Sequence, residues 1–171
     1  MRMFFYAVSI MGEIVSVSMG LASAQLYNPA MGSQSNVIEQ FQLVLATLFF
    51  LALNGHHIFI AGLASSFDLV PVASIGVNYK AFAGIAVMVQ DVFLMGLKMS
   101  APVLIAVLLA NVVMGIVGRA VPQINVLVTG LPVTIMLGLG VLIVITPLFV
   151  LEMGGLLNLM AERFFTVMKV L

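Results

Sequence analysis

The stretch Leu94 to Pro132, LMGLKMSAPVLIAVLLANVVMGIVGRAVPQINVLVTGLP, decides the fold. It contains a run of twenty residues without charge, Met99 to Gly118, between Lys98 and Arg119. At ~1.5 Å of rise per residue, a helix of this length spans about 30 Å, the thickness of the hydrocarbon core of a bilayer. Because Pro122 cannot continue a helix, the sequence predicts a turn there, after which the next apolar segment folds back on the first.

Composition places the chain among membrane proteins. Of its 171 residues, 63% are hydrophobic and 7% are charged, whereas roughly 25% of the residues of a soluble domain are charged. Six basic and six acidic residues cancel, which argues against nucleic acid or an acidic substrate as a partner. The absence of cysteine from the sequence excludes disulfides and thiol chemistry. We expect a single all-α membrane domain over residues 1–171.

The apolar pattern predicts about four long helices and a tail. Their expected ranges are 3–26, 40–67, 82–118 with a break near 98–102, and 131–151, followed by an amphipathic surface helix over 152–171. A hydropathy count gives four membrane spans. Pro102 and Pro147 lie near the ends of their segments and predict kinks or frayed ends.

The first segment carries small side chains on one face. They recur every three or four residues, at Ser9, Gly12, Ser16, Gly20 and Ser23. In a membrane such a face lets another helix backbone approach closely. Glu13 lies one residue away from this face, where a carboxylate must meet protein or water. An inter-helix hydrogen bond is the simpler role for it, and a proton-carrying role is the alternative.

Further polar groups interrupt the later segments. His56 and His57 are adjacent, so their side chains point about 100° apart on a helix, which is unsuited to a shared metal ion. We therefore interpret them, with Asn54, as groups that hydrogen-bond to another subunit or line a wet interface. Asp91 and Lys98 share a helix face but are separated by ~10.5 Å of helix rise, so each is predicted to have its own partner elsewhere.

Residues Leu26 to Asn36, LYNPAMGSQSN, have the composition of a turn or loop. Pro29 and Gly32 favour a local turn, and Asn28 adds a polar side chain to it. Leu26, Tyr27 and Met31 add apolar bulk to this segment. An ordinary connecting loop is one interpretation, and the sequence leaves the choice open at this point.

Two motifs resemble the FliR family, the export-gate subunits of the bacterial flagellar type III secretion system, which are related to the SctT subunits of injectisomes. The first motif begins with Gly-Leu-Lys98-x-x-Ala-Pro102, includes Asn111, and ends with the run Arg119-Ala-x-Pro-Gln-x-Asn125 to Gly130-x-Pro132. The second motif is Leu-Ala-Leu-Asn54-Gly55-His56-His57. The resemblance extends from about Gly12 to Pro147. Family members usually begin with a further apolar N-terminal region, which implies that this chain is a short gene product or a fragment.

The resemblance implies a gate subunit rather than an enzyme, without cofactor or metal. FliP-like and FliQ-like subunits would complete the channel for unfolded proteins, and FlhB-like and FlhA-like export proteins would be further partners. The assembly would lie in the lipid of the bacterial inner membrane, at the flagellar basal body. Residues 26–32 would then match the loop that plugs the pore. The expected interface or polar intramembrane residues are Glu13, Asn54, His56, His57, Asp91, Lys98, Asn111, Arg119, Pro122, Gln123 and Asn125.

Two other classes of protein remain as alternatives. A small secondary transporter would use the same intramembrane charges to bind a proton or solute, but no inverted internal repeat is visible in the sequence. An intramembrane metalloenzyme would depend on His56 and His57. No catalytic triad, phosphate-binding loop or helical carboxylate pair is present in the sequence. The FliR resemblance implies that the energy for export comes from a partner ATPase and the proton-motive force, both outside this chain.

Overall fold

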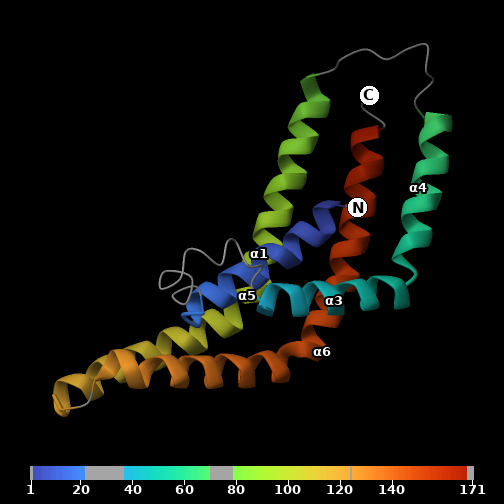
Figure 1. Ribbon diagram of the computed structural model, residues 1–171. Coiled ribbons are helices and arrows are strands. Elements are labelled where there is room, and N and C mark those ends of the chain that lie inside the picture. Colours follow the sequence, from blue (N-terminus) through green and yellow to red (C-terminus); the bar gives the residue numbers. More distant parts are fainter. Residues whose placement is uncertain (1, 22–36, 70–78, 124, 169–171) are drawn as a thin grey trace, which may run out of the picture.

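The computed structural model describes residues 2–21, 37–69, 79–123 and 125–168 (Figure 1). This part of the chain contains helices and turns but no strand, which confirms the predicted all-α fold. The helices are α1 (Arg2–Ser18), α3 (Val37–Ala52), α4 (Gly55–Leu69), α5 (Tyr79–Ala120) and α6 (Val126–Met168).

The two longest helices form a hairpin. α5 has 42 residues and α6 has 43, and the chain reverses between them in the turn that contains Pro122. Figure 1 shows the yellow end of α5 and the orange start of α6 running side by side as an arm that projects from the other helices. The predicted fold-back of the second apolar segment on the first is confirmed.

Two predicted boundaries inside this hairpin are wrong. α5 runs through residues 98–102 without a break, with Pro102 inside it. Residues 152–168 are not a separate surface helix, because α6 continues through them and buries Met153, Leu156 and Met160 in the core. A proline inside a helix removes one backbone hydrogen bond and bends the helix without necessarily ending it. Pro147 lies inside α6 in the same way, and Figure 1 shows that both long helices bend.

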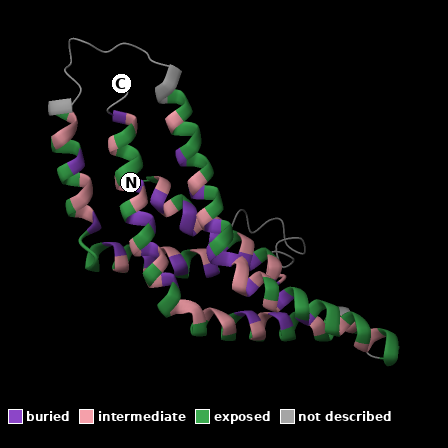
Figure 2. Ribbon diagram, turned by 180° about the vertical axis from the view of Figure 1, so that it is seen from behind, coloured by how far each residue is buried: buried purple, intermediate pink, exposed green. Residues whose placement is uncertain are grey.

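The core surrounds α1. One face of this helix presents Phe4, Val8, Met11 and Val15, at intervals of three or four residues, and each is at most 1% exposed. α3 and α5 pack against α1, and Figure 2 shows buried residues concentrated where these helices cross, whereas the arm is largely exposed.

α1 is shorter than the predicted segment 3–26. It ends at Ser18, and Gly20 follows with a φ of 85°. The amide of Gly20 donates to the carbonyl of Val17, and that of Leu21 donates to Ser16, at 3.0 and 3.1 Å. This is a Schellman ending, which uses a left-handed glycine to satisfy the last carbonyls of a helix.

The predicted helix 40–67 is divided into α3 and α4, which bend by 68° at residues 53–54. Asn54 adopts a φ of 55°, a left-handed conformation that asparagine tolerates better than most residues. By length and composition, α5 and α6 could each cross a membrane, and the bent pair would make a third span. Within the described residues, two or three spans therefore replace the four of the hydropathy count.

Candidate functional site: polar contacts between the helices

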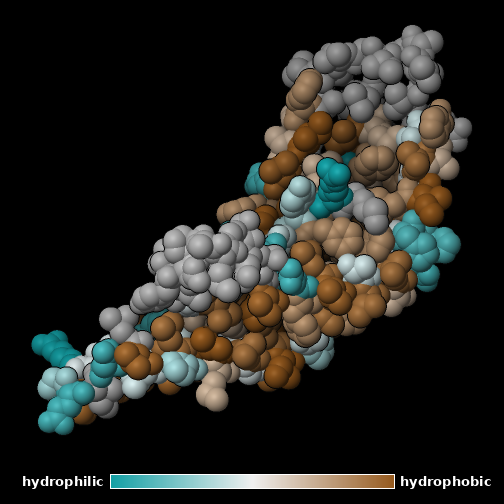
Figure 3. Space-filling model, in the orientation of Figure 1, coloured by the Kyte–Doolittle hydropathy of each residue, from teal (hydrophilic) through white to brown (hydrophobic). Residues whose placement is uncertain are grey.

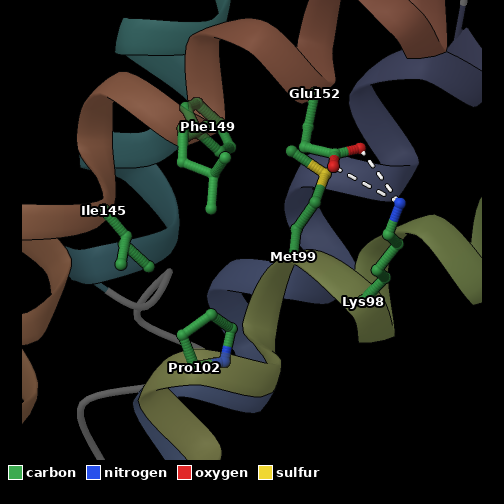
Figure 4. A pocket seen from close by; sticks show the side chains of 7 residues that line it. Lys98, Met99, Pro102, Ile145, Phe149 and Glu152 are labelled. Carbon is green, nitrogen blue, oxygen red and sulfur yellow. Dashed lines mark hydrogen bonds and ion pairs between the residues drawn. The ribbon is translucent and has the colours of Figure 1, made fainter.

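An ion pair joins α5 to α6 beside their bends. The Nζ atom of Lys98 lies 3.3 Å from Oε1 of Glu152 and donates a hydrogen bond to Oε2 at 3.4 Å. Figure 4 shows the two side chains meeting across a small pocket of about 120 Å³ that Met99, Pro102 and Phe149 help to line. In water such a half-exposed pair contributes only about 0–1 kcal/mol. It would contribute more where lipid or protein lowers the local dielectric constant.

A second ion pair joins the same two helices with the opposite polarity. The Nε atom of Arg163 on α6 lies 3.0 Å from Oδ2 of Asp91 on α5. Its N–H is not directed at this oxygen, which has no hydrogen-bond partner among the described residues, so the contact is an attraction of charges. The prediction that Asp91 and Lys98 pair elsewhere is confirmed. A slide of α6 along α5 would separate the charges of both pairs, so the two pairs favour one alignment of α5 and α6.

α3 packs against the face of α1 that carries the small side chains. The hydroxyl of Ser9 donates a hydrogen bond to Oε1 of Glu39 on α3. A Cβ added to Gly12 would lie 2.7 Å from the Cα of Glu39, so only glycine permits this approach. Ser16 is fully buried. The predicted close approach of another helix is confirmed at Ser9 and Gly12, whereas Ser23 lies outside the described residues.

Sequence reasoning missed several residues of these contacts. Glu39, Glu152 and Arg163 supply the partners of Ser9, Lys98 and Asp91. It also missed Gln42, which is 3% exposed on α3. A signal was present, because a charge or amide inside an apolar helix is costly in lipid and needs a partner.

Glu13 has none of the contacts that its neighbours make. Its side chain is exposed on α1, and it forms no hydrogen bond with the described residues. The inter-helix hydrogen bond expected of Glu13 is made instead by Glu39, from the facing helix. The role of Glu13 at an interface with another subunit stays a prediction.

The histidine pair lies at the start of α4, at the bend between α3 and α4. The ring centroids of His56 and His57 are 4.3 Å apart, with an interplanar angle of 38°. Nδ1 of His56 is buried and has no hydrogen-bond partner among the described residues. Nowhere in the described ranges do three potential metal-ligating side chains gather.

The remaining predicted residues lie along the arm. Asn111 is exposed on α5, and Arg119, Pro122 and Gln123 are exposed at the tip, where Figure 3 shows hydrophilic atoms gathered. The carbonyl of Asn125 accepts hydrogen bonds from the amides of residues 128 and 129 at 3.1 Å, which begins α6.

The structure therefore does not bring the predicted residues together. They lie in four places: the exposed side of α1, the ion-paired contact of α5 and α6, the bend between α3 and α4, and the arm. The expected plug segment, residues 26–32, lies outside the described residues.

Comparisons with known proteins agree on one family. The family described as "Bacterial export proteins, family 1" matches residues 1–160. The flagellar biosynthetic protein FliR of Bacillus subtilis is 38% identical over 145 residues, which are 83% of this chain and 56% of that protein. FliR of Aquifex aeolicus is 33% identical over 91% of this chain and 60% of its own length, and FliR of Escherichia coli is 32% identical over 86% and 57%. The chain thus spans less than two thirds of the length of the curated relatives it matches. Because the match covers nearly all of this sequence, the chain belongs to the FliR family of bacterial export proteins.

Proposed function

We propose that the chain is a structural and gating subunit of a flagellar type III protein export gate. In this proposal it forms, with FliP-like and FliQ-like subunits, the channel through which unfolded flagellar proteins cross the inner membrane at the basal body. FlhB-like and FlhA-like proteins are the further partners expected on the cytoplasmic side. Family membership supports the proposal, and the surface of the α5–α6 arm supplies the physical reason.

The observation that carries the proposal is the exposed amide of Asn111. This side chain lies within the uncharged run Met99 to Gly118, among exposed apolar neighbours such as Leu108 and Val112. Apolar side chains alone could face lipid equally well. A lone amide in lipid has no hydrogen-bond partner, whereas a neighbouring helix can supply one. The arm is therefore best explained as a surface for other subunits.

We assign the closure of the channel to residues Leu26 to Gly32. A channel wide enough for an unfolded chain must be closed at rest, because ions would otherwise leak and collapse the membrane potential. Closure requires a compact segment that can be displaced, and a turn with Pro29 and Gly32 suits this better than a packed helix. Tyr27 and Met31 would exclude water without adding a charge that attracts ions.

Purification in mild detergent tests the proposal. Co-expressed with FliP-like and FliQ-like partners, the chain should elute in one discrete complex that contains all three proteins. Expressed alone, it should aggregate or be degraded, because groups such as Asn111 and Glu13 would lack partners. A stable, monodisperse monomer or homodimer that does not bind the co-expressed partners would contradict the proposed gate function and support a small secondary transporter.

A further inference from the structure

The end of α1 is fastened to α6 within the projecting arm. Thr134 of α6 is 5% exposed, and its hydroxyl lies 3.1 Å from the carbonyl of Met19 and 3.0 Å from that of Leu131 in its own helix, so it can donate to either. The carbonyl of Met19 follows the last residue of α1 and has no partner within that helix. Thr134 therefore supplies, from another helix, a donor that the end of α1 lacks.

A glycine beside Thr134 completes this contact. The side chain of Met19 is 0% exposed and fills the space that Gly138 leaves open, because a Cβ at Gly138 would lie 2.8 Å from the Cγ atom of Met19. Residues four apart in a helix lie on one face, so Thr134 and Gly138 meet α1 together. Figure 1 shows the C-terminal end of α1 beside the arm. Packing and a hydrogen bond thus hold the end of α1 at one point of α6.

The earlier part of α1 is fixed outside the arm. The carbonyl oxygen of Ala7 packs against Gly96 of α5, where an added Cβ would lie 2.9 Å from it. Gly12 lies against Glu39 of α3 in the same close manner. The roughly twelve residues from Ala7 to Met19 span about 18 Å. α1 therefore connects the helices at the base of the arm with a point farther along it.

The base of the arm offers little resistance to bending. Pro102 of α5 and Pro147 of α6 have no amide N–H, so neither can donate the usual helical hydrogen bond. The pocket of about 120 Å³ beside Pro102 also leaves the two helices incompletely packed there (Figure 4). A missing hydrogen bond and a void both make a helix easier to bend. Local structure at the base therefore sets the direction of the arm only weakly.

Leverage decides which contact controls this direction. Thr134 lies about 20 Å of helix from Pro147, so rotating the arm by about 10° would move its hydroxyl by about 3.5 Å and break the bond to Met19. Lys98 and Glu152 both lie on the other side of the two prolines, so their ion pair does not oppose this rotation. The contact of α1 with α6 does oppose it.

We propose that the end of α1 is a brace that sets the angle of the arm, with Thr134 and Gly138 as its positioning residues on α6. The tip lies about 32 Å of helix beyond Pro147, so a rotation by about 10° would move it by about 5 Å. At Asn111 the same rotation gives about 2 Å, enough to break a hydrogen bond to a neighbouring subunit. The proposal rests on the proposed function, in which the arm meets those subunits.

An engineered disulfide tests the contact. The chain has no cysteine, so Met19→Cys with Gly138→Cys can form only one intramolecular bond. The Cγ atom of Met19 marks the place of a cysteine sulfur, and its 2.8 Å distance from a Cβ at position 138 suits a disulfide without backbone movement. We expect oxidation in membranes to protect both thiols from a maleimide mass tag. In the control, Met19→Cys with Gly140→Cys, the thiols should stay reactive, because a Cβ at Gly140 meets no described atom within 4 Å.

Spin labels measure the angle of the arm in the purified, co-expressed complex. They are attached to cysteines that replace Gln123 at the tip and Ile60 on α4, both exposed. Thr134→Val keeps the shape of the side chain but removes the hydroxyl. We expect it to broaden the distance distribution by about 5 Å and to lower the recovered complex about two- to fivefold, as one weakened hydrogen bond predicts. Thr129→Val is the matched control and should behave as wild type, since the Thr129 hydroxyl donates to a carbonyl of its own helix.

The disulfide also supplies a rescue. Reduced Met19→Cys with Gly138→Cys should lower the recovered complex as Thr134→Val does, because it loses the packed methionine, and oxidation should restore the complex. A contact that only stabilised the fold would change the amount of protein and leave the distance distribution narrow.

Failure of the brace is distinguishable from failure of the proposed function. An intact complex in which the two thiols stay reactive, or in which Thr134→Val keeps the narrow distribution, would overturn the brace and leave the gate in place. If the wild-type chain forms no complex with the partner subunits, the proposed function is wrong. Thiols that also stay reactive in membranes would then show that the contact of α1 with α6 is wrong as well.

Discussion

Replacing Gly12 by alanine tests the close contact of α1 and α3. The added Cβ would lie 2.7 Å from the Cα of Glu39 and 2.8 Å from Oε1 of Gln42. The glutamine side chain can rotate away, but the backbone of α3 cannot. α3 must therefore move outward by roughly 1 Å to restore an ordinary contact of ~3.5–4.0 Å.

The expected change in the free energy of unfolding is the balance of one stabilising and two destabilising effects. Alanine in a helix interior is favoured over glycine by about 0.8–1 kcal/mol. Overpacking against a backbone costs about 1–3 kcal/mol, and the outward shift also weakens the Ser9–Glu39 hydrogen bond, worth about 1 kcal/mol. The balance is a loss of about 2 kcal/mol, which for a protein of this size corresponds to a melting temperature lower by about 4–8 °C.

Gly154→Ala and Gly155→Ala are the controls, because no atom lies within 4 Å of a Cβ at either position. These variants gain the same helix propensity without a clash and should melt at or slightly above the wild-type temperature. The chain contains no tryptophan, so the measurement is size-exclusion chromatography of heated samples that carry a fluorescent C-terminal fusion, co-expressed with the partner subunits. A Gly12→Ala protein that melts with the two controls would refute the close approach of α3.

Three further predictions address the ion pairs, the tip and the plug. Lys98→Glu should place two carboxylates together and reduce the yield of the complex, measured by chromatography, several-fold. Adding Glu152→Lys should restore this yield. A double variant that yields no more complex than the single variant would contradict the ion pair. Pro122→Ala or Arg119→Glu should weaken assembly, seen as loss of the large complex on blue-native gels, whereas intact complexes with normal export in both would mean that the turn is unimportant. Deleting residues 27–34 should raise small-ion conductance and slow growth while the complex still forms, and unchanged conductance and growth would leave this segment a plain connector.

Local pattern was enough to predict most of the fold. The uncharged run before Arg119 and the turn at Pro122 predicted a hairpin, and the small residues around Gly12 predicted a close helix contact. These features depend on hydrogen bonds and side-chain spacing within a few turns of one helix, and the local sequence is enough to predict both. The prediction of a break at Pro102 was wrong because it considered the local sequence alone. Neighbouring helices can support a bent helix through a proline, and the local sequence does not include those neighbours.

The sequence by itself determined that this chain is helical and apolar, where its longest hairpin turns, and that Asp91 and Lys98 would not pair with each other. Only the tertiary structure decided that Arg163 and Glu152 are their partners, that Glu39 rather than Glu13 bonds to the facing helix, and that residues 152–168 continue α6 and bury one face in the core. Periodicity identifies which face of a helix is apolar, but the choice of the neighbouring face depends on packing among segments far apart in the chain. For this reason Gln42 appeared as one amide among many in the sequence, and only the structure shows that it is buried beside Gly12 of α1.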